Sequence, residues 1–216
     1  DAIVLTEMND VVSILKKVGG VITNDHFVYT SGKHGSVYIN KDAVYTHVNE
    51  TSKIGKMFAI KFKSKAIDVV AAPALGGIIL SQWTAYHLSK LKGKEVISVY
   101  TEKTPDKDQV FTRGYDKLVK NKKVLVIEDL TTTGGSVKKV VKSVKKAGGK
   151  VIGVAVMVNR NPKGVNAKFM GVPFAALGVI KAEAFDANKC ELCNKNVPIN
   201  TTVGHGKKYL AGKRTK

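Results

Sequence analysis

Two adjacent carboxylates beside a glycine-containing turn are the residues of this chain best suited to do chemistry. They lie in residues 124–136, which read VLVIEDLTTTGGS: an apolar run leads into Glu128 and Asp129 and then into small hydroxyl residues and two glycines. Free backbone N–H groups in such a turn, at the N-terminus of a helix, bind phosphate. The carboxylates can accept hydrogen bonds from sugar hydroxyls, or hold Mg²⁺ through water. Together these groups predict a site for a ribose 5-phosphate.

A strand and a helix must hold this turn. Residues 124–127 have the length and β-branching of a buried parallel strand. After the turn, valines recur at helical spacing, lysines fill the other face, and Gly148 with Gly149 ends the pattern. The alternative is an ordinary strand-to-helix loop with an acidic helix start. The coincidence of strand, carboxylates and turn favours the ligand site.

A second turn of small residues follows the predicted strand 68–72. It reads Pro-Ala-Leu-Gly-Gly at 73–77 and leads into a helix that begins near Ile78. The helix N-terminus again favours an anion, although close packing of strand against helix explains such glycines about equally well. Open α/β sheets bind ligands at the carboxyl ends of their strands. We therefore expect both turns to lie in one crevice.

Strands and helices alternate through the middle of the chain, which predicts an α/β fold with a mostly parallel sheet. Residues 101–123 form a long polar connection, typical of a lid or of disorder. The last dozen residues are too basic and too poor in apolar residues to belong to the core. One domain of 216 residues is the simplest organisation. We expect strands at 68–72, 95–100, 124–127 and 151–158, helices at 9–18, 49–63, 76–91 and 137–147, and short strands at 27–30 and 37–40.

The composition limits the class of protein. No apolar run approaches the roughly 18 residues that span a bilayer, and the first residues lack the pattern of a signal peptide, so we expect a soluble, cytoplasmic protein. The net charge of +19 attracts anions. Nucleic acid is one candidate partner. No aromatic residues interleave the lysines of the helix at 137–147, so a solvated surface that steers an anionic metabolite is favoured.

Residues 124–136 resemble the thirteen-residue signature of the type I phosphoribosyltransferases, and within that family the chain looks most like an orotate phosphoribosyltransferase. The resemblance implies a central mostly parallel sheet flanked by helices, all in one domain, 1–216. It also implies a small hood from about 20–45 with C-terminal elements, a mobile loop at about 101–118 and a basic tail at about 205–216. Magnesium and a homodimer with shared active sites are implied as well.

The resemblance assigns roles to the two turns and the loop. Lys103 and Arg113 would neutralise the leaving diphosphate, with Lys107 as an equally good candidate, and Glu128 and Asp129 would hold the sugar diol. The loop has no histidine, in contrast to many orotate enzymes, and the alternative for each basic residue is a solvated charge. The residues expected to bind 5-phosphoribosyl 1-diphosphate are Ala72, Pro73, Ala74, Gly76, Gly77, Lys103, Lys107, Glu128, Asp129, Thr131, Thr132, Thr133, Gly134, Gly135 and Ser136.

The choice of base depends on residues 27–40 and on Arg160. Residues 27–40 resemble the hood segment of the orotate enzymes, and a planar guanidinium after strand 151–158 can clasp a carboxylate. The alternatives are a plain β-hairpin and a surface arginine. Acceptors other than orotate, such as a purine, and a non-catalytic RNA-binding regulator of the same fold stay open. The residues expected to bind orotate are Ser31, Gly32, Lys33, Tyr38, Ile39, Thr132 and Arg160.

The two cysteines, Cys190 and Cys193, form a C-x-x-C pair that could supply half of a zinc site. His205 is a conceivable third ligand, and no fourth is evident. A reduced pair in a C-terminal appendage is the favoured interpretation. None of the histidines has a paired nucleophile, so the sequence gives no support to covalent catalysis.

Overall fold

The computed structural model describes residues 10–181 and 183–214, and these form two compact units. The larger unit contains the described residues before Leu15 together with Val44–Ile180. The smaller unit contains Leu15–Ala43 and the described part of Lys181–Lys216. Asn9, the first residue of a predicted helix, and residues 215–216 of the predicted tail lie outside the described residues.

The larger unit is built on a six-stranded sheet with the order β5-β4-β3-β6-β7-β8. All neighbouring strands are parallel except β4 and β5, which are antiparallel. This arrangement confirms the predicted α/β fold with a mostly parallel sheet. The strands are β3 (Val69–Pro73), β4 (Ile97–Lys103), β5 (Gln109–Val110), β6 (Lys123–Thr131), β7 (Lys150–Asn159) and β8 (Phe174–Val179).

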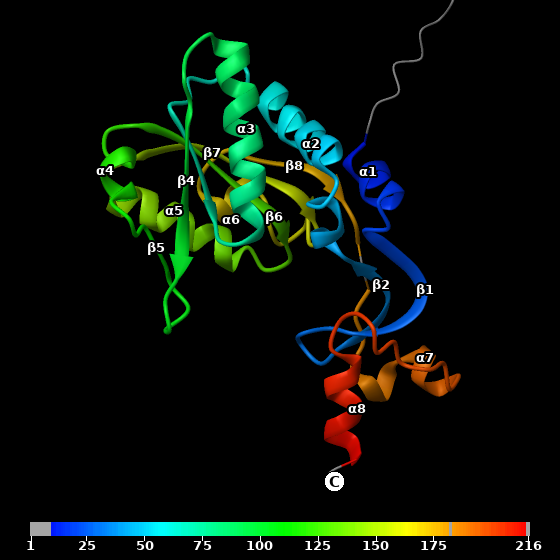
Figure 1. Cartoon of the computed structure of the whole chain (residues 1–216). Helices are drawn as coiled ribbons and strands as arrows, with labels where there is room; N and C mark the ends of the chain where they lie inside the picture. The colour runs from blue at the N-terminus through cyan, green and yellow to red at the C-terminus, as the bar shows by residue number, and fades with distance from the viewer. Residues whose placement is uncertain (1–9, 182, 215–216) are drawn as a thin grey trace, which may run out of the picture. The chain divides into compact units, whose positions relative to one another are not determined.

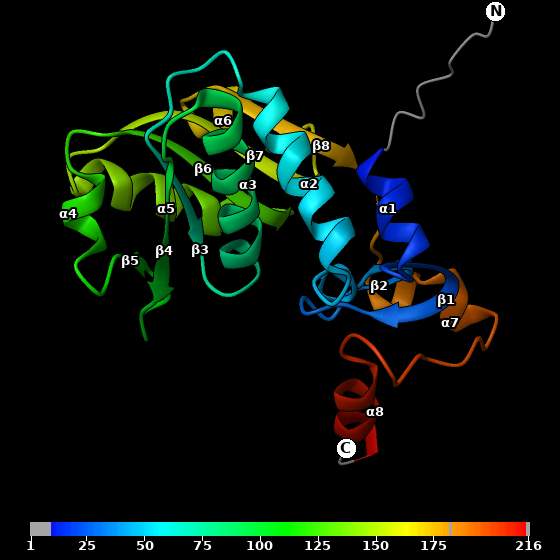
Figure 2. The same ribbon diagram turned by 45° about the horizontal axis from the view of Figure 1, so that its top comes forward.

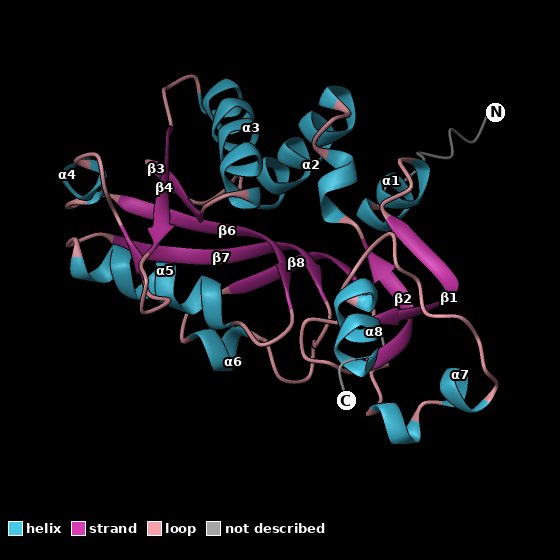
Figure 3. Ribbon diagram, turned by 60° about the horizontal axis from the view of Figure 1, so that its bottom comes forward, coloured by secondary structure: helices cyan, strands magenta, loops and turns pink. Residues whose placement is uncertain are grey.

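Helices cover both faces of this sheet (Figure 3). On one face lie α2 (Val48–Lys61) and α3 (Gly76–Lys92), and on the other α5 (Gly135–Lys146) and the short α6 (Ala167–Met170). The valines of α5 pack against β3 and β6 in a core of valines, and its lysines face outward. A short helix, α4 (Tyr115–Val119), adds Val119 to the same core. The central strands β3, β6 and β7 are continuous buried runs, as expected for a parallel sheet that helices cover on both faces, and the unit therefore has three layers.

The smaller unit pairs an N-terminal hairpin with the C-terminal segment (Figures 1 and 2). The hairpin strands β1 (Val21–Val28) and β2 (His34–Ile39) are antiparallel. Single bridges join His26 to Ile199 and His34 to Phe185, so the C-terminal segment returns to both strands. The other elements of this part of the chain are α1 (Val11–Lys17) and η1 (Lys41–Val44), which each extend into the larger unit, and η2 (Ala187–Lys189), α7 (Glu191–Asn194) and α8 (Gly206–Arg214).

The structure differs from the sequence prediction mainly where the chain is polar. The connection predicted at 101–123 contains β5 and α4, because Thr101 donates a buried hydrogen bond to the side chain of Gln109 (2.7 Å) and Val119 enters the core. The basic tail forms α8, and the edge of Tyr209 contacts the His34 ring at a centroid distance of 4.9 Å. None of the described helices is both long and apolar enough to cross a membrane.

Candidate phosphate and sugar site

The two carboxylates lie in the last residues of β6, which is longer than predicted. Glu128 and Asp129 are 7% and 5% exposed, and the strand continues to Thr131, which pairs with Asn159 of β7. Glu128 accepts a hydrogen bond from the backbone N–H of Asp129 (3.0 Å). Asp129 accepts one from the N–H of Leu130 through Oδ1 (2.6 Å). These local bonds fix both carboxylates at the carboxyl end of the sheet.

The second glycine turn lies directly against Asp129. A Cβ added at Gly76, the first residue of α3, would lie 1.9 Å from Oδ2 of Asp129. Tyr45 donates its hydroxyl to the same oxygen at 3.1 Å. The structure thus places the second turn against a carboxylate that directly precedes the first turn, in agreement with the crevice that the sequence predicted. Tyr45 was not predicted, because nothing in the local sequence connects it with β6.

The turn between β6 and α5 leaves its small residues open to solvent. Thr131 is buried and accepts a hydrogen bond from the N–H of Gly134 (3.1 Å), which has a left-handed backbone with φ of 74°. The first turn of α5, all of it described, carries no acidic side chain. An anion can therefore approach the positive end of α5 without repulsion. The exposed residues of the turn are Thr132, Thr133, Gly135 and Ser136.

The two glycines of the second turn are each required by a different contact. At Gly77 an added Cβ would meet the Cβ of Ala72 at 2.8 Å and the Cδ of Pro73 at 3.1 Å, so packing of α3 on β3 requires glycine there. Gly76 faces the carboxylate instead. Ala72 and Pro73 are buried, and Ala74 donates its N–H to the carbonyl of Thr101 (2.9 Å). Of the two interpretations of these glycines, packing accounts for Gly77 and proximity to the site accounts for Gly76.

The basic residues of the predicted loop are exposed. Lys103 ends β4, Lys107 lies in the turn before β5, and Arg113 precedes α4. Arg113 pairs with Glu102 at 3.4 Å. Hydrogen bonding from Thr112, aided by Arg113, lowers the pKa of Glu102 below its ordinary value, so this carboxylate is ionised at neutral pH. To reach a diphosphate, Arg113 would exchange this ion pair for the ligand.

Arg160 follows β7 and stays close to the signature turn. Its backbone N–H donates to the carbonyl of Thr131 at 2.9 Å. Asn159, which precedes it, is 2% exposed and donates its side-chain amide to the carbonyl of Val165 (2.9 Å). Asn159 thereby anchors the loop that carries Arg160. The role of Asn159 is therefore structural.

The predicted orotate residues of the smaller unit lie in the β1–β2 hairpin. Ser31, Gly32 and Lys33 form its exposed turn, where Gly32 has a φ of 79° and Lys33 lies 3.6 Å from Asp186. Tyr38 packs on Phe27 with ring centroids 5.4 Å apart. Ile39 follows Tyr38 directly in β2, and successive strand residues point to opposite faces. Only one of Tyr38 and Ile39 can therefore wall a given pocket.

His205, the conceivable third zinc ligand, is not part of the cysteine cluster. Its Nε2 lies 3.0 Å from the hydroxyl of Thr30. The cysteines face two other histidines, His26 and His34. The signal was absent from the local sequence because more than 150 residues separate the histidines from the cysteines.

Comparison with known proteins agrees with this geometry. Residues 40–170 match the phosphoribosyl transferase domain family. The orotate phosphoribosyltransferase of Caldanaerobacter subterraneus is 35% identical over 89% of this chain and 95% of its own length. That of Thermus thermophilus is 30% identical over 88% of this chain and 98% of its own length.

Solved structures show the same fold. The orotate phosphoribosyltransferase of Mycobacterium tuberculosis, in complex with inorganic phosphate, superposes with a TM-score of 0.64 at 21% identity, over 79% of this chain and 95% of that one. An adenine phosphoribosyltransferase from Thermoanaerobacter pseudethanolicus gives a TM-score of 0.57 at 20% identity, over 77% of this chain and 99% of that one. Fold likeness alone does not distinguish the base, whereas the curated relatives do. The chain belongs to the phosphoribosyltransferase family, in its orotate phosphoribosyltransferase branch.

Proposed function

We propose that this protein transfers the 5-phosphoribosyl group of 5-phosphoribosyl 1-diphosphate to orotate, giving orotidine 5′-phosphate and diphosphate in pyrimidine biosynthesis. The observation that carries the proposal is the approach of Gly76 to the Asp129 carboxylate. A phosphate turn, a pair of carboxylates and a second helix N-terminus occupy one edge of the sheet. That arrangement matches a sugar that carries phosphate at one carbon and diphosphate at another.

Each group has a role that follows from its chemistry. The N–H groups and hydroxyls of residues 131–136 bind the 5-phosphate, and Glu128 and Asp129 accept hydrogen bonds from the two ribose hydroxyls. Departure of diphosphate leaves an oxocarbenium-like sugar, beside which the carboxylates lie. The backbone at 72–77, Lys103 and Arg113 stabilise the negative leaving group. Lys107 is an alternative donor.

Magnesium is the metal expected for this substrate. The carboxylates of Glu128 and Asp129 are oxygen ligands of the kind that Mg²⁺ takes, through water, beside phosphate groups. When bound, Mg²⁺ supplies positive charge to the departing diphosphate. The residues of the chain position the sugar and its phosphate.

Orotate differs from the other candidate bases in carrying a carboxylate. Arg160 lies next to the signature turn through its bond to Thr131, and a guanidinium there can bind that carboxylate by two parallel hydrogen bonds. The resemblance to the orotate enzymes also assigns contacts with orotate to Ser31, Gly32, Lys33, Thr132 and one of Tyr38 and Ile39. We further propose that the enzyme acts in the cytoplasm as a homodimer, by analogy with the family.

A base panel tests the proposal. Purified protein, Mg²⁺ and 5-phosphoribosyl 1-diphosphate are combined in turn with orotate, uracil, adenine, hypoxanthine and xanthine, and diphosphate release is measured. Turnover with orotate alone is the expected result. Turnover with a purine would assign a different base, and salt-dependent RNA binding without any turnover would favour the regulatory alternative.

The variant Arg160→Ala adds a selective test. It should lose orotate turnover by at least an order of magnitude while the melting temperature stays within a few degrees. Arg160→Lys serves as the matched variant, because it keeps the charge and loses the planar fork. Full activity in both variants would remove Arg160 from the base site.

A further inference from the structure

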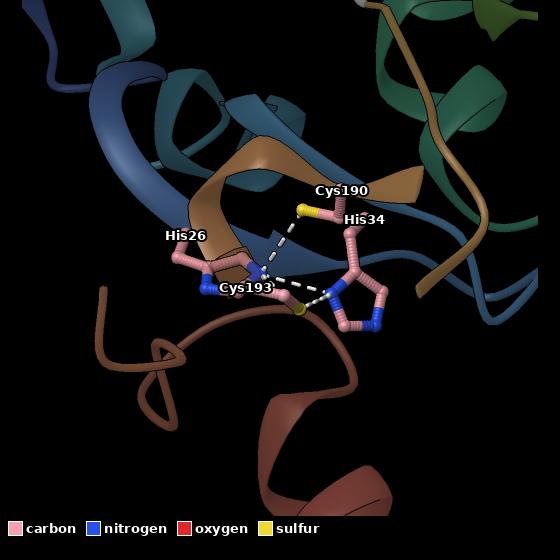
Figure 4. Close-up of side chains that lie close together, drawn as sticks. All are labelled: His26, His34, Cys190 and Cys193. Atoms are coloured by element: carbon pink, nitrogen blue, oxygen red, sulfur yellow. Dashed lines mark hydrogen bonds between the residues drawn. The ribbon is translucent and has the colours of Figure 1, made fainter. Parts of the chain in front are cut away.

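Four side chains of the smaller unit converge on one point (Figure 4). His26 comes from β1, His34 begins β2, Cys190 precedes α7 and Cys193 lies within it. One donor atom from each residue lies within 4.8 Å of the other three. Among the described residues, this is the group of histidine, cysteine and carboxylate side chains that has the geometry of a metal site. It is made wholly by the smaller unit.

The distances between the donor atoms fit a tetrahedral metal. With Zn–N of about 2.05 Å and Zn–S of about 2.3 Å, tetrahedral angles put two nitrogens about 3.4 Å apart and a nitrogen and a sulfur about 3.6 Å apart. Nε2 of His26 and Nδ1 of His34 are 2.9 Å apart. The Sγ atoms of Cys190 and Cys193 each lie 3.7 Å from Nε2 of His26. Sγ of Cys193 lies 3.3 Å from Nδ1 of His34. Each of these four distances is within about 0.5 Å of the ideal value, and the remaining pairs of donor atoms lie within 4.8 Å of each other.

The neighbouring backbone fixes the tautomer of His26 that a metal requires. Nδ1 of His26 lies 2.8 Å from the carbonyl of Val197. A carbonyl only accepts, so Nδ1 carries the proton and the lone pair of Nε2 points at the cluster. Metal-bound histidines usually donate their second ring N–H to such a carbonyl. The backbone N–H and carbonyl of His34 both bond to Phe185, at 2.7 and 2.8 Å, which fixes the start of β2.

Burial makes this arrangement costly without a metal. His26, His34 and Cys190 are at most 1% exposed, and Cys193 is partly buried. Four polar side chains whose donor atoms face one another in a largely buried space are costly to remove from water. A divalent cation satisfies all four at once. Two thiolates also neutralise its charge, so no net charge is buried.

We propose that His26, His34, Cys190 and Cys193 bind one Zn²⁺ ion in a closed Cys₂His₂ site. Four protein ligands leave no open position, so the ion is structural and takes no part in phosphoribosyl transfer. It cross-links three separate stretches of the chain: both strands of the hairpin and the α7 segment. This site is independent of the proposed magnesium and of the proposed reaction.

Metal analysis of the native protein is the first test. The protein is expressed without a histidine tag, passed over a desalting column and analysed by inductively coupled plasma mass spectrometry, with thiols counted in parallel. We expect one zinc per chain. Replacement by Co²⁺ should give the strong visible bands of a tetrahedral site with thiolate ligands. Absence of any metal, together with failure of added Zn²⁺ to bind, would overturn the proposal, as would a disulfide between Cys190 and Cys193 in the native protein.

Variants identify the ligands. Cys193→Ser and His26→Gln should each lower zinc content at least several-fold, whereas His205→Gln, in the same unit but bonded to Thr30, should keep it. His34→Cys is the rescue variant: Nδ1 is the ring nitrogen nearest the backbone, so a thiolate at 34 can form a Cys₃His set that still binds zinc. Equal zinc content in Cys193→Ser and the wild type would sink the assignment. If one equivalent of another metal bound to the same four residues, the metal site would stand and its assignment to zinc would be wrong.

Zinc content and turnover test the zinc site and the proposed enzymatic function separately. A protein with zinc but no turnover on any base would support the site and reject the proposed function. A protein without zinc that turns over orotate would do the reverse. Neither measurement depends on the other, because zinc is counted by mass spectrometry and turnover by diphosphate release.

Discussion

The two units of this molecule obtain their order in different ways. The larger unit buries a continuous set of valines and other apolar side chains on both faces of a parallel sheet. In the described part of the smaller unit, Leu15, Phe27, Val28 and Tyr29 are the large buried apolar side chains, and its centre is occupied by His26, His34 and the cysteines. Small units rarely bury enough apolar surface to be stable alone, and metals commonly compensate.

This difference explains where chemistry can be placed. The sheet of the larger unit is stable enough to hold two buried carboxylates and an open helix N-terminus at one edge, although neither feature favours folding. The smaller unit presents exposed turn residues at one end of a short hairpin, and its cluster of two histidines and two cysteines joins the two hairpin strands to the α7 segment. The comparison predicts that catalytic variants and ligand-cluster variants affect separate observables.

The largest expected effect is on turnover. Replacing Glu128 by Gln and Asp129 by Asn together should lower kcat by at least about 100-fold, because the charge beside the cationic sugar is lost. Zinc content and melting temperature should stay close to the wild type. Diphosphate release, metal analysis and calorimetry measure the three quantities. Near-normal turnover would contradict the assigned role of the carboxylates.

Zinc removal should act on the smaller unit alone. After treatment with a strong chelator, amide hydrogen exchange should accelerate by at least an order of magnitude in β1, β2 and α7 and stay unchanged in β3, β6 and β7. Trp83, the single tryptophan, lies in α3 of the larger unit, so its fluorescence should not change. Equal acceleration of hydrogen exchange in both units would show that they unfold together, and would contradict the separate stabilisation of the two units.

A substitution in the apolar core should destabilise the larger unit and leave the zinc site of the smaller unit intact. Leu125 of β6 is fully buried, and Leu125→Ala should reduce the free energy of unfolding of the larger unit by about 2–5 kcal/mol. Denaturant unfolding followed by Trp83 fluorescence measures this loss. Zinc content should remain one per chain, and Ile79→Ala, at a site on α3 that is 38% exposed, is the milder control. Loss of zinc with Leu125→Ala would indicate coupling between the units.

The two glycines of the second turn separate stability from function within the larger unit. Gly77→Ala should cost about 1–3 kcal/mol, because the new Cβ meets the rigid Ala72 and Pro73. Gly76→Ala displaces the end of the Asp129 side chain, so it should reduce turnover more than stability. Calorimetry and kinetics on both variants test this, and the reverse ranking would refute the distinction.

What the sequence could predict follows the same division. Residues 124–136 carry strand, carboxylates and phosphate turn within one stretch, so the fold class, the main strands and the approach of the two turns were predictable. Tyr45 and the partners of the cysteines were not, because each contact joins residues far apart in the chain. Strand β5 was not predicted because its stretch of the chain is polar, and its position depends on the buried hydrogen bond between Thr101 and Gln109. Local patterns therefore describe the larger unit better than the smaller one.

The smallest expected effect is on the pH dependence of stability. It tests whether acid affects the two units differently. Partial burial lowers the pKa of His87 in α3, with Lys56 adding to the effect and the bond to Ser52 opposing it. Below about pH 6.5 the unfolded chain binds a proton that the folded protein disfavours, so the larger unit loses stability as pH falls from 6.5 toward the lowered pKa.

His87→Gln should flatten the pH dependence of the stability of the larger unit as pH falls below about 6.5, measured by denaturant unfolding with Trp83 fluorescence. The exposed His47→Gln is the matched control and should keep the wild-type profile. In the smaller unit acid should act differently, because metal binding in proteins is itself pH-dependent. An unchanged slope in His87→Gln, with zinc still bound, would assign the pH dependence of the larger unit to other groups.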